Sequence, residues 1–172
     1  MARSKRRSAL GRHEVDPLDA RAARAAALDA LARRDHACGD LHRKLLEKGY
    51  DVAVVAPLID ALRGEKLLDD RRFTENFVAY HAARGQGPLR IRAELRRHGL
   101  EGALAEECLD AFPDWILHLR GARQKKFGVA APSEYADRQR QTRFLGYRGF
   151  TSAQIRTALG FDTDLDADTP ET

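Results

Sequence analysis

Residues 45–50 of the chain read Leu-Leu-Glu-Lys-Gly-Tyr, residues 95–100 read Leu-Arg-Arg-His-Gly-Leu, and residues 145–150 read Leu-Gly-Tyr-Arg-Gly-Phe. Each stretch has a leucine four residues before a glycine, at least one cation between them, and a large apolar residue after the glycine. This pattern is typical of a helix that ends at a left-handed glycine, with the next residue folding back onto the last turn. The interval is 50 residues both times, which is typical of repeat proteins. We therefore expect three copies of one helical unit, with Gly49, Gly99 and Gly149 as structural residues.

Each repeat is predicted to contain three helices. Ala, Leu, Arg and Glu, which favour helices, dominate the sequence, and no segment shows the sustained alternation of a strand. Pro57 is expected to kink the third helix or to delay its start to Ala56. The predicted fold class is all-α, an elongated curved array of three tandem three-helix repeats. The expected helices span residues 17–34, 37–48, 52–64, 70–84, 88–98, 101–111, 114–127, 137–148 and 152–160.

The two segments that flank the repeats have opposite charge. Residues 1–14 hold five cations against one carboxylate and are predicted to form a basic disordered arm. Residues 161–172 hold five carboxylates and no cation, and they are predicted to form an acidic disordered tail. One hypothesis is that the tail shields the basic part of the same chain. Between the arm and the tail, the predicted repeats span residues 15–64, 65–112 and 113–160.

The repeats themselves differ in charge. The chain carries +4 overall, the first repeat is neutral, the second is −1, and the third is +6, with nine cations against three carboxylates. A solvated polar face explains a single exposed arginine, but arginines on matching helices of two repeats favour an anionic partner, because the guanidinium fork binds phosphate and carboxylate alike. The predicted partner-binding or DNA-binding residues are Arg90, Arg92, Arg96, Arg97, Lys125, Lys126, Arg138, Arg140, Arg143 and Arg148.

Catalytic, metal and membrane functions find little support in the sequence. His36, Cys38 and His42 have metal-ligand spacing but lack a further strong ligand pair, and Asp69–Asp70 is better explained as a helix cap than as an acid–base pair. No apolar run is long enough to span a bilayer, and the N-terminus lacks the apolar core of a signal peptide. We expect a cytoplasmic protein with reduced cysteines, no cofactor, no metal and no enzymatic activity.

Each repeat contains a motif: Leu31-Ala32-Arg33-Arg34-Asp35-His36 with Gly49-Tyr50, then Leu67-Leu68-Asp69-Asp70-Arg71-Arg72-Phe73 with Gly87-Pro88, Arg90-Ile91 and Glu94-Leu95, and finally Phe144-Leu145 with Arg148-Gly149-Phe150. Together these motifs resemble, in the same order, three motifs of the bacterial RecX family. The resemblance covers about residues 22–160, and neither the arm nor the tail takes part in it. Ala37 stands where the family often has a serine cap before an acidic partner, here Asp40, so half of that capping box is absent, and Phe77 stands where an aromatic residue, often tyrosine, is usual.

Membership of this family would imply a non-enzymatic regulator of the RecA recombinase. Such a regulator binds the RecA–DNA filament, opposes its growth, and reduces ATP hydrolysis and strand exchange, in recombination, DNA repair and the SOS response. The family has no settled catalytic residues that could be assigned here. We expect a monomer. The alternative hypothesis is a general basic DNA-binding protein, whose phosphate contacts with single- or double-stranded DNA would make its affinity strongly salt-dependent.

Overall fold

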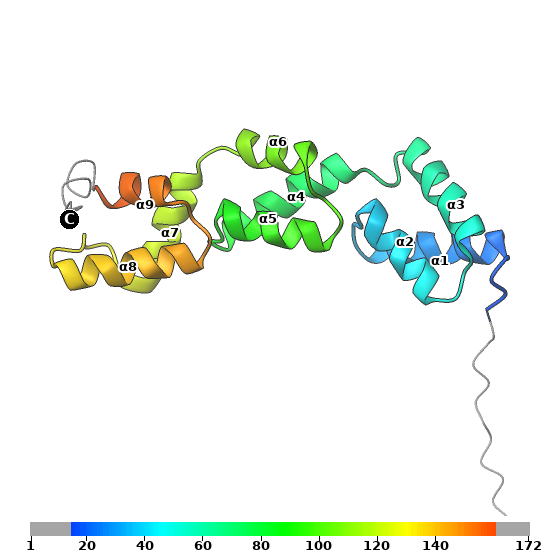
Figure 1. Cartoon of the computed structure of the whole chain (residues 1–172), viewed down its shortest axis with the longest axis horizontal. Helices are drawn as coiled ribbons and strands as arrows, with labels where there is room; N and C mark the ends of the chain where they lie inside the picture. Colours follow the sequence, from blue (N-terminus) through cyan, green and yellow to red (C-terminus); the bar gives the residue numbers. More distant parts are fainter. Residues whose placement is uncertain (1–14, 161–172) are drawn as a thin grey trace, which may run out of the picture. The chain divides into compact units, whose positions relative to one another are not determined.

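The computed structural model of the chain describes residues 15–160 (Figure 1). Within that range the chain forms nine α-helices and no strand, so the predicted all-α class and the predicted helices are confirmed. The expected arm, residues 1–14, and the expected tail, residues 161–172, lie outside the described residues. The helices are α1 (Ala20–Arg33), α2 (Cys38–Glu47), α3 (Val52–Gly64), α4 (Asp70–Ala83), α5 (Pro88–Arg97), α6 (Ala103–Ala111), α7 (Trp115–Phe127), α8 (Tyr135–Tyr147) and α9 (Ser152–Leu159).

The helices group in threes, and the contacts divide the chain into two compact units. One unit ends at Leu68 and contains the first repeat, α1–α3. The other begins at Asp69 and contains the second and third repeats, α4–α6 and α7–α9. Inside each repeat every helix contacts the other two. The second and third repeats also contact each other, through α4 and α7.

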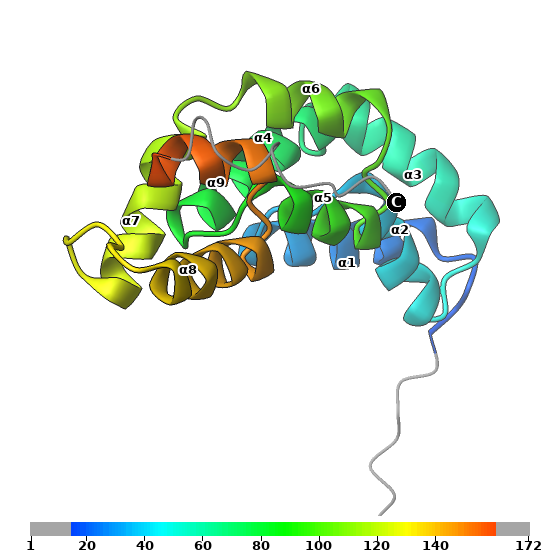
Figure 2. The same ribbon diagram turned by 60° about the vertical axis from the view of Figure 1, so that its left-hand side comes forward.

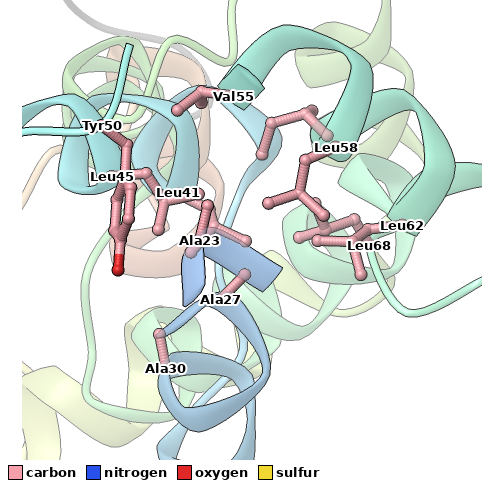
Figure 3. Close-up of a cluster of buried hydrophobic side chains, with 11 residues drawn as sticks. Ala23, Ala27, Ala30, Leu41, Leu45, Tyr50, Val55, Leu58, Leu62 and Leu68 are labelled. Atoms are coloured by element: carbon pink, nitrogen blue, oxygen red, sulfur yellow. The ribbon is translucent and has the colours of Figure 1, made fainter. Parts of the chain in front are cut away.

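The core of the first repeat is built around small residues on α1. Ala23 and Ala27 are fully buried one helical turn apart, so α2 and α3 can approach α1 closely. Leucines from both helices fill the space beside these alanines (Figure 3). The side chains drawn there are Ala23, Ala27, Ala30, Leu41, Leu45, Tyr50, Val55, Leu58, Leu62 and Leu68, with one further core residue unlabelled.

Pro57 lies inside α3 and does not delay its start, so the predicted delay to Ala56 is wrong. The helix begins at Val52 because the carboxylate of Asp51 accepts a hydrogen bond from the amide of Ala53 at 2.8 Å. This cap holds the first turn ahead of the proline. The proline then removes a single backbone donor, a cost that burial of Val55, Leu58 and the rest of the apolar face of α3 offsets.

The three recurring glycines each end the second helix of a repeat. Their φ angles are +99° for Gly49, +76° for Gly99 and +89° for Gly149, which is the left-handed region that glycine adopts without strain. The amide of the following residue returns to the helix in each copy. Tyr50, Leu100 and Phe150 donate to the carbonyls of Leu45, Leu95 and Leu145 at 3.3, 3.0 and 3.2 Å, and all three side chains are buried.

The second and third repeats are locked together where α8 ends against the start of α5. The amides of Gly87 and Leu89 donate to the carbonyls of Arg148 and Gly149, at 2.7 and 3.0 Å. Gly87 provides no side-chain cap for α5, so the end of α8 satisfies amides that a helix start leaves without partners. A Cβ on Gly87 would lie 2.3 Å from the carbonyl carbon of Gly149. This junction therefore requires glycine at residue 87.

Candidate anion-binding surface

The four predicted arginines of α5 fall into two classes. Arg90 pairs with Glu94 one turn along the helix, Nε to Oε1 at 3.1 Å. Arg92 makes two hydrogen bonds of 2.6 Å to the carboxylate of Glu106 on α6, which lowers the pKa of Glu106 and raises that of Arg92. Arg96 and Arg97 are exposed, and neither forms an ion pair within residues 15–160. Among the four arginines of α5, Arg96 and Arg97 at its end are therefore the ones that remain available to an external anion.

The predicted binding cations of the third repeat lie on α7 and α8, with Arg148 directly after the end of α8. Lys125, Lys126 and Arg143 are exposed and have no ion-pair partner in the described part of the chain. Arg140 pairs with Asp137 at 2.5 Å, and its guanidinium lies 5.4 Å from the centroid of the Phe127 ring. Arg138 donates to the backbone carbonyl of Ser133 at 3.0 Å. The predicted residues of the third repeat thus include three cations without an ion pair and arginines that also hold the loop and helix of this repeat.

Arg148 has a structural task that sequence reasoning missed. Its guanidinium donates to the carbonyl of Gly85 at 2.8 Å and to that of Arg84, the two residues that directly follow α4. Its own carbonyl accepts from Gly87, as described above. One residue therefore closes the end of α4 with its side chain and the start of α5 with its backbone. A cation before a helix-stopping glycine gives no sequence signal of such a contact, because the receiving carbonyls lie 63 and 64 residues away.

A second unpredicted group is the bridge between Arg123 and Gln141. Gln141 is 2 % exposed, and its side-chain oxygen accepts from Nε of Arg123 at 2.8 Å. Arg123 also donates to the carbonyl of Ala130 in the loop between α7 and α8. The amide of Gln141 donates to Asp137 at 3.3 Å. The one sequence signal was a glutamine four residues before the buried Leu145, on the core face of α8.

Two adjoining hollows run along α7 and α8. The first, about 430 Å³, lies between α4, α7 and α8, and the second, about 770 Å³, lies between the end of α7, the following loop and α8. Lys126 and Phe144 line both, so we treat the hollows together as the basic groove. The rings of Phe144 and Phe127 pack edge to face with centroids 5.3 Å apart.

The lining of the basic groove combines apolar walls with cations. Small or aliphatic residues form much of the first hollow, and among the described residues that line it none is a carboxylate. The second hollow contains Asp137, which Arg140 already neutralises. The arrangement can hold an anion beside an apolar group. The apolar residues of the first hollow are Ala83, Leu117, Ala122 and Phe144, with Gly85 and Gly121, and its charged residues are Arg84, Lys125, Lys126 and Arg148.

Two titratable side chains outside this surface, His36 and Cys108, are buried in the fold. His36 is 3 % exposed, and neither ring nitrogen has a hydrogen-bond partner among residues 15–160. Burial is the main cause that lowers its pKa. Burial likewise raises the pKa of the Cys108 thiol, which disfavours the reactive thiolate. In the described part of the chain, no group of three or more His, Cys, Asp or Glu side chains could hold a metal ion. None of the described helices could cross a membrane.

Comparison with known proteins accounts for each repeat. Residues 23–62, 69–109 and 118–159 match the first, second and third three-helix domains of RecX. The regulatory protein RecX of Halorhodospira halophila is 44 % identical over 138 residues, which is 80 % of this chain and 86 % of that protein. That of Pseudomonas entomophila is 39 % identical over 139 residues, 80 % of this chain and 90 % of that protein.

Solved structures agree with the fold. The crystal structure of RecX from Lactobacillus salivarius superimposes with a TM-score of 0.73 at 19 % identity, covering 83 % of this chain and 96 % of that one. A second crystal structure of a regulatory protein RecX gives a TM-score of 0.67 at 22 % identity. From three domain matches in the expected order and relatives at this level of identity, the chain belongs to the RecX family of regulatory proteins.

Proposed function

We propose that this chain binds the RecA recombinase and its nucleoprotein filament, and thereby limits filament growth, ATP hydrolysis and strand exchange during recombination and DNA repair. It acts as a binding protein and not as an enzyme, in the cytoplasm and as a monomer. Family membership supports the regulatory role. The observation that carries the proposal for this chain is that five of the predicted partner-binding residues are exposed and have no ion-pair partner within residues 15–160, namely Arg96, Arg97, Lys125, Lys126 and Arg143.

The electrostatics of these cations suit a filament partner. A nucleoprotein filament presents phosphates and acidic side chains repeatedly along its length, and complementary charge speeds encounter and fixes orientation. Arg90 and Arg92 contribute less to such binding, because their pairs with Glu94 and Glu106 would have to be broken first. We therefore assign partner contact mainly to the end of α5 and to the basic groove.

General DNA binding is the second candidate function. The basic groove favours it, because cations beside the aromatic rings of Phe127 and Phe144 resemble the lining of single-strand binding sites. Phosphate contacts of this kind give an affinity that falls steeply with salt. The two candidates differ in one respect: a plain DNA-binding protein would act on any DNA-bound protein, whereas the proposed regulator acts on the recombinase.

Electron microscopy of recombinase filaments tests the proposal. Filaments on single-stranded DNA should be shorter in the presence of this protein, and the shortening should persist at salt concentrations that abolish its binding to bare DNA. Filaments of unchanged length at equimolar protein would contradict the proposal. Shortening that disappears together with binding to bare DNA would favour the second candidate.

A further inference from the structure

The first hollow of the basic groove is shaped for a short segment that carries one large apolar side chain between acidic residues. Its floor is apolar and closely packed, since Ala122 is 7 % exposed and Gly85 is buried. Leu117 is exposed on its wall. Lys125 and Lys126 stand on the rim without carboxylate partners in residues 15–160. A leucine flanked by carboxylates would bury its side chain on the floor and face the two lysines with its charges.

Residues 161–172 of this chain contain that pattern. The sequence after Gly160 is Phe-Asp-Thr-Asp-Leu-Asp-Ala-Asp, in which an aspartate stands at every second position and Leu165 lies between Asp164 and Asp166. The segment contains no cation. It therefore complements the groove in both charge and apolar character, and the third repeat, at +6, is the most basic part of the chain between residues 15 and 160.

The segment also begins close enough to the groove. The helix before it, α9, packs against α7 (Figure 2). Residues of α7 line both hollows. Leu165 is the fifth residue after Gly160, and five extended residues span up to ~17 Å, which is close to the ~20 Å length of the 13-residue helix α7. A short tether also gives an effective concentration on the order of millimolar. At that effective concentration, contacts that would be too weak to bind a separate peptide are sufficient to hold the tethered segment in the groove.

We propose that residues 161–168 dock in the basic groove of their own chain, with Leu165 on the apolar floor of the first hollow and Asp164 and Asp166 facing Lys125 and Lys126. The docked segment covers the same cations that an external anionic partner would contact. An incoming partner must therefore displace it. The proposal concerns the isolated chain, so it stands or falls independently of binding to the recombinase.

Nuclear magnetic resonance of the full-length chain tests the docking. The first variant replaces Asp162, Asp164, Asp166 and Asp168 by asparagine and keeps the length unchanged. We expect the amide signals of Leu117, Gly121, Lys125 and Lys126 to shift relative to the wild type. Salt should reproduce the same shifts in the wild type as the Debye length falls to about 3 Å near 1 M.

A reciprocal pair of variants locates the contact. Lys125→Gln with Lys126→Gln should move the signals of residues 162–168, whereas Arg96→Gln with Arg97→Gln, which removes the same charge from α5, should leave them in place. Unchanged groove signals in the asparagine variant would overturn the proposal. Equal effects of the two glutamine pairs would also overturn it, because they would show diffuse attraction. Shifts that grow with protein concentration would assign the contact to a second copy and overturn docking within one chain.

Discussion

The amide of Gly87 donates to the carbonyl of Arg148 at 2.7 Å, and this contact joins the start of α5 to the end of α8. The same arginine closes α4 through its guanidinium. Three helix ends from two repeats therefore meet at one residue. Each repeat has a glycine that ends its second helix at the matching position. Gly149 differs from the other two because it also lies close to Arg90 and Gly87. This junction joins the second and third repeats within one compact unit.

Replacing Gly87 by alanine should destabilise the second compact unit. The added Cβ would lie 2.3 Å from the carbonyl carbon of Gly149 and from the amide nitrogen of Phe150. Both atoms are backbone, so relief requires the helix ends to separate, at about 1–3 kcal/mol or more. Urea denaturation measures the change. The control is Gly146→Ala on α8, where a Cβ meets nothing within 4 Å and stability should rise by up to about 1 kcal/mol.

Gly149 and Gly99 should respond differently to the same substitution. Both have positive φ, so alanine costs about 1–2 kcal/mol at either position. At Gly99 a Cβ meets nothing within 4 Å, whereas at Gly149 it would lie 2.5 Å from the Cβ of Arg90. Gly149→Ala should therefore lower the melting temperature more than Gly99→Ala does. Equal losses would show that the junction tolerates the extra atom.

The substitution Arg148→Lys should preserve the positive charge and destabilise the protein. A single ammonium on a flexible stem does not reproduce the guanidinium fork that reaches the carbonyls of Arg84 and Gly85. We expect Arg148→Lys to lower the free energy of unfolding by about 1–3 kcal/mol, the typical loss when hydrogen bonds from a charged donor are removed. Arg143→Lys, at an exposed position, should change it little. If Arg148→Lys changed the free energy of unfolding as little as Arg143→Lys does, the Arg148 side chain would serve partner binding and not stability.

Stability of the first repeat should fall on mild acidification. Burial of His36, together with nearby Arg34 and Lys44, lowers its pKa in the folded state, while in the unfolded chain it titrates near about 6.5. The unfolded state therefore binds more protons in this range, so stability decreases as pH falls through about 6.5 towards the folded-state pKa. Hydrogen exchange of the α1–α3 amides measures the effect. His36→Leu should remove the dependence and His42→Gln should retain it.

The helices could be predicted from local signals in the sequence, whereas contacts between residues far apart in the sequence could not. The stops at Gly49, Gly99 and Gly149 and the cap at Asp51 act within one turn of chain, so their residues alone indicate the helix ends. The pairing of Arg92 with Glu106 depends on how α5 packs on α6, and the role of Arg148 depends on a neighbouring repeat. The sequence therefore identified the basic residues without separating those that hold the fold from those that remain available.

ATP hydrolysis by the recombinase on single-stranded DNA tests the central claim most directly. The wild-type chain should lower the rate at sub-stoichiometric amounts. Lys125→Glu with Lys126→Glu should require about tenfold more protein for the same effect, since two rim contacts at about 0.5–1 kcal/mol each correspond to that factor. Arg21→Glu with Lys48→Glu, an equal charge reversal on exposed positions of the first repeat, should act like the wild type. A rate unchanged by equimolar wild-type protein would contradict the proposed function.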